Sequence, residues 1–137
     1  MKVIVVKDYD AVSKEAFAVM KEVVTNKKDA VLGLATGSSP IGLYKNMIQD
    51  HKDNGTSYAQ CQSFNLDEYV GIDRNHPESY WTFMHENLFK GIDLPEDKIH
   101  VPYGSTKEDC EGYEKAMEKC QRGCTGSGNR RKRTYRI

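Results

Sequence analysis

The chain has 137 residues, 38% hydrophobic and 29% charged, and a formal net charge of zero at pH 7. This length suits one domain with its own core, and no run of roughly 18 apolar residues is present to cross a membrane. The zero charge hides an asymmetry, because residues 121–137 carry six Lys or Arg and no acid, leaving 14 basic and 20 acidic side chains in residues 1–120. The body is therefore acidic and only the tail is basic.

The N-terminal segment contains four successive β-branched residues at positions 3–6, between lysines. This run is too short for a signal-peptide core and lacks a small-residue cleavage site, so it predicts a buried strand in a cytoplasmic protein. A helix follows, with Asp10 as its predicted N-cap and an apolar stripe between Val12 and Val24 at helical spacing.

Strands and helices alternate through the rest of residues 1–120. A short apolar run at 30–35 predicts a strand, and residues 62–66 and 99–102 are further candidate strands. Helices are expected to begin at Pro40, with Ser39 as N-cap, near Pro77, and after a capping box of Ser105 and Glu108. This order predicts an α/β fold, Rossmann-like, with a mostly parallel sheet and flanking helices.

The four cysteines form no CxxC pair and have no nearby histidines at metal-site spacing. We therefore expect reduced thiols rather than a disulfide framework or a zinc site.

The segment LATGSSP at residues 34–40 joins a predicted strand to a helix through small residues. Backbone N–H groups converge at such a turn, the helix dipole adds partial positive charge, and hydroxyl groups can donate hydrogen bonds. The alternatives are a phosphate site and an ordinary capped turn. The loop has neither the lysine of a Walker motif nor the spacing of a dinucleotide fingerprint, which disfavours nucleotide binding.

The segment FNLDEYV places Asp67 and Glu68 at the carboxyl end of a predicted strand, where open α/β sheets form their ligand crevices. An acid there is a candidate catalytic base, although an adjacent acidic pair is more commonly solvated surface. His76, in the segment HPESY, either belongs to a helix cap or faces the site.

Together, LATGSSP, FNLDEYVG, HPESYWTFM and GIDLPEDKIHVPYG resemble the glucosamine-6-phosphate deaminase family over residues 1–120. The resemblance implies conversion of glucosamine 6-phosphate to fructose 6-phosphate and ammonia, without a metal or organic cofactor, and an assignment among the hydrolases. It implies that Asp67 shuttles the proton between C1 and C2, which requires one carboxylate in reach of two neighbouring carbons.

The resemblance also assigns roles to the residues around Asp67. Thr36, Gly37, Ser38 and Ser39 would hold the substrate phosphate, and Glu68, Tyr69 and His76 would support the site. The implied partner is a small-molecule substrate, with neither nucleic acid nor membrane, and the full-length parent is compatible with a homo-oligomer.

The chain departs from the family at its C-terminal tail, residues 121–137. Family members continue with a GIGxNGHIGFNEP-type segment that carries the ring-opening histidine, so this chain is expected to lack the C-terminal half of the domain and to be inactive or nearly so. Codons for residues 121–137 can be chosen so that, after loss of the first base, they read SEGVQVLGIGGNGHIG. We therefore interpret the tail as a frameshifted, disordered segment. The alternative is a non-catalytic protein that binds sugar phosphates, or nucleic acid through its basic tail.

Overall fold

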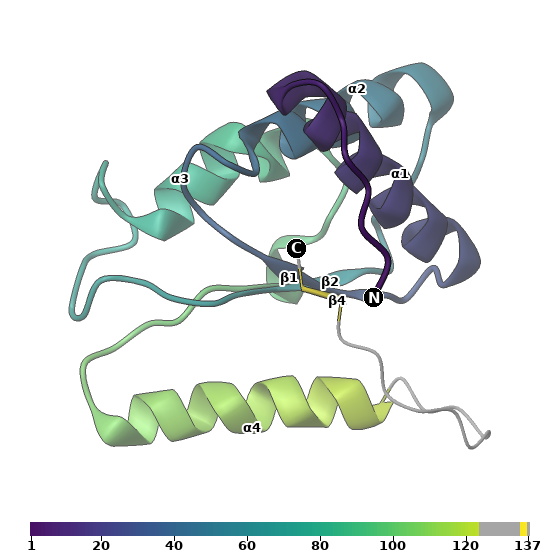
Figure 1. The fold of residues 1–137 in the computed structure, drawn as a ribbon. Coiled ribbons are helices and arrows are strands. Elements are labelled where there is room, and N and C mark those ends of the chain that lie inside the picture. The colour runs from purple at the N-terminus through teal and green to yellow at the C-terminus, as the bar shows by residue number, and fades with distance from the viewer. Residues whose placement is uncertain (124–134, 137) are drawn as a thin grey trace.

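The fold is a parallel sheet with helices on both faces, seen in a computed structural model that describes residues 1–123 and 135–136. Helices α1 (Tyr9–Asn26), α2 (Ile41–Asn54) and α3 (Tyr80–Asn87) lie on one side of the sheet, and α4 (Lys107–Gly123) lies on the other (Figure 1). Two short 3-10 helices, η1 (Phe89–Gly91) and η2 (Glu96–Lys98), follow α3. The expected α/β class with flanking helices is confirmed.

The sheet has the strand order β3-β2-β1-β4, and every neighbouring pair is parallel. Its strands are β1 (Val31–Leu34), β2 (Gln62–Asn65), β3 (Ile99–His100) and β4 (Tyr135–Arg136). The register pairs Leu34 with Asn65, so the segments that leave β1 and β2 emerge at the same edge of the sheet. This register positions the candidate site.

The prediction of a strand over residues 3–6 is wrong. No strand forms there, and the side chains of Val3, Ile4 and Val5 are 69%, 49% and 90% exposed. The physical reason is that β1 already has a partner on each edge, β2 on one and β4 on the other, so the N-terminal segment has no free edge of β1 to join.

The C-terminal segment enters the structure in two places. The first three residues of the predicted tail, 121–123, continue α4, and Tyr135–Arg136 forms β4 beside β1. The other tail residues, for which we expected disorder, lie outside the described residues.

Three of the predicted helix starts are shifted. Asp8, not Asp10, caps α1, and its carboxylate accepts from Ala11 N at 2.9 Å. Pro40 is itself the N-cap of α2, without a side-chain cap. The helix expected near Pro77 begins at Tyr80 instead, because the backbone turns over the preceding residues and Ser79 provides the cap.

The cap of α4 also lies one residue beyond the predicted box. Thr106 N donates to the Asp109 carboxylate at 2.9 Å, and Asp109 N donates to Thr106 Oγ1 at 3.2 Å. Ser105 N bonds the same carboxylate at 3.0 Å, so Asp109 holds the start of the helix in place of the predicted Glu108.

The core lies mainly between the sheet and helices α1 to α3. Its buried residues include Leu32 and Leu34 of β1, Tyr44 and Met47 of α2, and Met84 of α3. In contrast, none of residues 107–120 of α4 is fully buried. Across the described residues, no helix combines the length and apolar character needed to span a membrane.

Candidate functional site

The turn after β1 is open to solvent and has unused hydrogen-bond donors. Gly37 adopts a φ of +94°, a conformation that favours glycine, and no atom lies within 4 Å of where its Cβ would be. Gly37, Ser38 and Ser39 are exposed. Among the described residues, no protein group accepts from the backbone N–H groups of residues 36–39. The turn therefore has the donors that an anion requires.

Tyr44 fixes the base of this turn from inside the core. Its buried hydroxyl donates to Ala35 O at 2.5 Å and accepts from Ala35 N at 3.2 Å. Burial raises the pKa of Tyr44 to about 12, partly offset by its hydrogen bond to Ala35, so the phenol stays protonated and can donate. The first residue after β1 is thus rigidly connected to α2.

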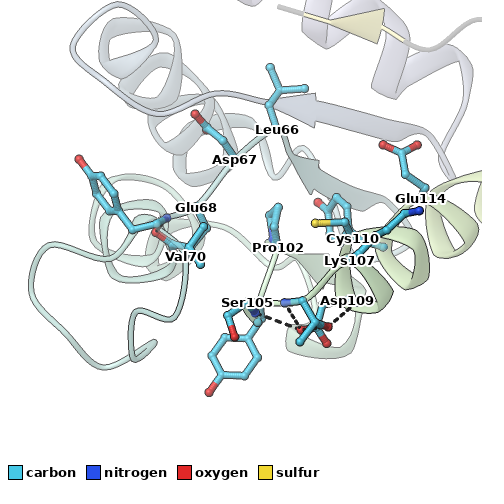
Figure 2. Close-up of a pocket in the computed structure, with 15 residues that line it drawn as sticks. Leu66, Asp67, Glu68, Val70, Pro102, Ser105, Lys107, Asp109, Cys110 and Glu114 are labelled. Atoms are coloured by element: carbon cyan, nitrogen blue, oxygen red, sulfur yellow. Dashed lines mark hydrogen bonds between the residues drawn. The ribbon is translucent and has the colours of Figure 1, made fainter.

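Asp67 lies on the equivalent segment after β2. Its side chain is exposed, and its carboxylate makes no hydrogen bond or ion pair with another described residue. Figure 2 shows the carboxylate directed away from α4. Since β1 and β2 are parallel and in register, Asp67 and the turn at residues 36–39 lie at the same edge of the sheet.

Tyr80, the first residue of α3, packs against the segment after β2. The rings of Tyr69 and Tyr80 are 5.0 Å apart between centroids. The side chain of Tyr69 is the largest cause of the raised pKa of Tyr80, followed by burial and by the charges of Tyr69 and Asp67, while Thr36 lowers it. Tyr80 therefore lies beside the segment that carries Asp67.

The sequence pattern did not reveal this position of Tyr80. In the segment HPESYW, an aromatic residue at this position fits the apolar face of a helix equally well. Tyr80 directly follows Ser79, the N-cap of α3, and its ring lies beside that of Tyr69.

Glu68 binds the N-terminus of α3. Its carboxylate accepts from Tyr80 N at 3.0 Å and Trp81 N at 3.1 Å, and also from Tyr69 N at 2.9 Å. The first backbone N–H groups of a helix have no partner within it, so Glu68 satisfies two of them and complements the helix dipole. In this way Glu68 fixes α3, and with it Tyr80, relative to the segment that carries Asp67.

His76 lies in the turn before α3. It is exposed, and its Nδ1 accepts from Glu78 N at 3.0 Å. The ring thus stabilises its own turn, and His76 is not among the residues that line the pocket beside Asp67.

That pocket has a volume of about 460 Å³ and lies between the segment after β2, the segment after β3 and the first turns of α4 (Figure 2). Its walls are residues 66–70, residues 102–106 and five residues of α4 (Lys107, Asp109, Cys110, Tyr113 and Glu114). Asp67, Glu68 and Tyr69 border the pocket, whereas residues 36–39 do not. The two predicted parts of the site share a sheet edge, but this pocket adjoins only one of them.

The described residues contain no group of three His, Cys, Asp or Glu side chains that could hold a metal ion. Cys61 is a buried thiol whose pKa is raised to about 11, chiefly by burial, and Cys110 is an exposed thiol.

Comparisons with known proteins agree with this architecture. Residues 8–131 match the family of glucosamine-6-phosphate isomerases and 6-phosphogluconolactonase. Glucosamine-6-phosphate deaminase 2 of Bacillus subtilis is 44% identical over 83% of this chain and 47% of its own length. The glucosamine-6-phosphate deaminase of Lysinibacillus sphaericus is 40% identical over 86% of this chain and 51% of its own length.

Solved structures show the same relationship. A monomeric glucosamine-6-phosphate deaminase superposes with a TM-score of 0.83 at 33% identity, over 87% of this chain and 51% of that one. The 6-phosphogluconolactonase of Thermotoga maritima shares the fold with a TM-score of 0.66 at 19% identity, over 83% of this chain and 52% of its own.

These relatives are named as deaminases and isomerases, so the expected assignment among the hydrolases is wrong. The chain spans about half the length of the relatives that it matches. Within those limits, this chain belongs to the glucosamine-6-phosphate isomerase and 6-phosphogluconolactonase family, among relatives named glucosamine-6-phosphate deaminase.

Proposed function

We propose that this chain is the N-terminal half of a glucosamine-6-phosphate deaminase, the half that holds the substrate phosphate and the enolising base. The observation that carries the proposal is the register of β1 and β2, which brings the turn at residues 36–39 and the segment of Asp67 to one edge of the sheet. A ligand with its phosphate on the turn after β1 would then extend along the sheet edge toward Asp67.

The chemistry of each group suits its role. The free N–H groups and hydroxyls of Ser38 and Ser39 can donate to phosphate oxygens. The Asp67 carboxylate is exposed and has no described protein partner, so it is available to accept a proton from C2 of an opened amino sugar and to return it to C1. This transfer leaves an imine at C2; water adds to that carbon and ammonia then leaves, giving fructose 6-phosphate.

Because the chain spans about half of its relatives, we propose that the chain alone releases little or no ammonia. We further propose that residues 121–137 arise from a shifted reading frame, as their back-translation indicates. Sequencing the gene across codon 120 tests this directly, because an uninterrupted frame in clean reads contradicts it.

We also propose a cytoplasmic enzyme whose partner is the sugar phosphate and not a nucleic acid. The basic run at residues 130–133, which would argue for nucleic acid, lies outside the described residues and within the segment that the shifted frame explains.

A chimera tests the proposed function. Residues 1–120 of this chain are joined to the C-terminal half of the Bacillus subtilis relative, and ammonia release from glucosamine 6-phosphate is measured for the chimera and for the 137-residue chain. We expect activity only in the chimera. Asp67→Asn should lower kcat by about 100-fold or more, as expected for loss of a general base, while the exposed control Asp97→Asn should not. Activity in the short chain, or an active Asp67→Asn chimera, would refute the proposal.

A further inference from the structure

Tyr9, at the start of α1, binds the turn after β1 from the side opposite the core. Its hydroxyl lies 2.9 Å from Ser38 O and 3.1 Å from Ser39 O, and it accepts from Gly42 N at 2.8 Å. One phenol oxygen therefore connects both carbonyls of the turn with the first turn of α2. These contacts join residues about 30 positions apart in sequence.

The approach of α1 to this turn is close and specific. A Cβ added at Gly42 would lie 2.1 Å from Ser13 Oγ and 3.0 Å from Tyr9 Cε1, so only glycine admits the two side chains of α1 at this point. Pro40 lacks an N–H group, and the N-terminus of α2 has no side-chain cap of its own. The Tyr9 hydroxyl takes the place of that cap by accepting from Gly42.

The hydroxyl also sets the direction of a peptide unit in the turn. A peptide is planar and trans, so a carbonyl and the N–H of the next residue point in opposite directions. When Ser38 O points toward Tyr9, the N–H of Ser39 must point away from Tyr9. Among the described residues nothing accepts from this N–H, so it remains free to bind an anion.

We infer that Tyr9 is a positioning residue for the phosphate turn, orienting the Ser39 N–H toward the substrate phosphate and holding the carbonyls of Ser38 and Ser39 away from it. The inference rests on the proposed phosphate site and adds a residue outside the recognised motifs. Tyr9 is 49% exposed and does not belong to the buried core. Its hydroxyl therefore acts on the shape of the turn more than on the stability of the fold.

The test is a titration of the 137-residue chain with inorganic phosphate and with glucosamine 6-phosphate, followed by ¹⁵N amide shifts. We expect saturable shifts at Gly37, Ser38 and Ser39 in the unmodified protein. Tyr9→Phe should weaken binding by about fivefold, the effect of one net hydrogen bond, with little change in melting temperature. Thr25→Val, which removes an exposed hydroxyl at the other end of α1, is the matched control and should bind normally.

Amide hydrogen exchange provides a readout that needs no substitution. In the unmodified chain, the Gly42 amide should be protected from exchange by Tyr9, and the Ser39 amide should not be protected. Of these two amides, phosphate should slow the exchange of Ser39 alone. If Tyr9→Phe binds phosphate as tightly as the unmodified chain, or if Gly42 exchanges as fast as Ser39, the role of Tyr9 is refuted while the proposed site stands. If the unmodified chain shows no shifts at residues 37–39, both fail.

Discussion

Replacing Glu68 should destabilise the protein even though Glu68 lies beside the candidate base. In Glu68→Ala, the N–H groups of Tyr80 and Trp81 lose a carboxylate that accepts at 3.0 and 3.1 Å. Hydrogen bonds to a charged group contribute about 1.5 to 3 kcal/mol each, but water can reach this half-buried helix end in the variant, so we expect a total loss of roughly 2 kcal/mol.

This loss can be converted into a melting temperature. The usual entropy of unfolding per residue gives a chain of 137 residues about 0.3 kcal/mol per kelvin. A loss of roughly 2 kcal/mol should therefore lower the melting temperature by about 7 °C. The assay is thermal unfolding followed by far-ultraviolet circular dichroism.

A matched control, Glu86, lies on α3, the helix whose N-terminus Glu68 binds. Glu86 forms only an exposed i,i+4 ion pair with Lys90, a kind of pair that contributes about 0.3 to 0.5 kcal/mol, so Glu86→Ala should shift the midpoint by no more than about 2 °C. Glu68→Gln keeps an acceptor without the charge and should fall between the two. If Glu68→Ala and Glu86→Ala have the same melting temperature, the Glu68 carboxylate does not stabilise the start of α3. Our account of how Tyr80 is positioned then fails.

Three further predictions concern the turns at the sheet edge. Gly104→Ala should destabilise far more than Gly37→Ala in urea unfolding, because both have positive φ, of +119° and +94°, but only the Cβ at 104 would lie 2.3 Å from the Asp109 carboxylate. Hydrogen bonds from the Thr106 hydroxyl and backbone N–H, and from Ser105, lower the pKa of Asp109. The stabilisation by Asp109 should therefore be complete above about pH 4 and be lost as pH falls through the folded pKa. Helical content, measured by circular dichroism, should fall over this pH range in the unmodified protein. In Asp109→Asn this pH dependence should be absent. Tyr44→Phe should cost about 1 to 3 kcal/mol in the same urea assay, because both polar groups of Ala35 lose their buried partner; a neutral result would contradict that role.

The sequence predicted most reliably what local patterns determine. Strand β1 is a short apolar run, and a parallel pairing with β2 places the segments that follow the two strands at one edge. Residues 36–39 and Asp67 follow these strands in the sequence, so the order of elements alone places them on the same side of the sheet. The roles of these residues remain predictions.

The errors arise where a choice depends on distant contacts. Val3 and its neighbours have the composition of a strand, but a strand needs a free edge, and β4 occupies the one beside β1. The contacts of Glu68 also depend on distant residues, because its partners are backbone groups up to 13 positions away. No periodicity encodes such a contact.

Helix starts form an intermediate case. Near α4, Ser105, Thr106, Glu108 and Asp109 all have side chains suited to capping, so two overlapping boxes compete. Asp109 prevails because its carboxylate reaches two backbone N–H groups and one hydroxyl at once. Local pattern located the helix but not its first residue.

The helices on the two faces of the sheet are packed against it to different extents, and this difference affects how the protein unfolds. Helix α4 is attached to the sheet by half-buried side chains and by the Tyr113 hydroxyl, which lies 2.7 Å from Asn65 O and 3.1 Å from His100 O. Helices α1 and α2, in contrast, enclose the buried core. Under mild denaturant α4 should detach as a separate cooperative unit and uncover the stacked rings of Phe64 and His100, while the opposite layer, with Tyr9 and the turn at residues 36–39, stays assembled.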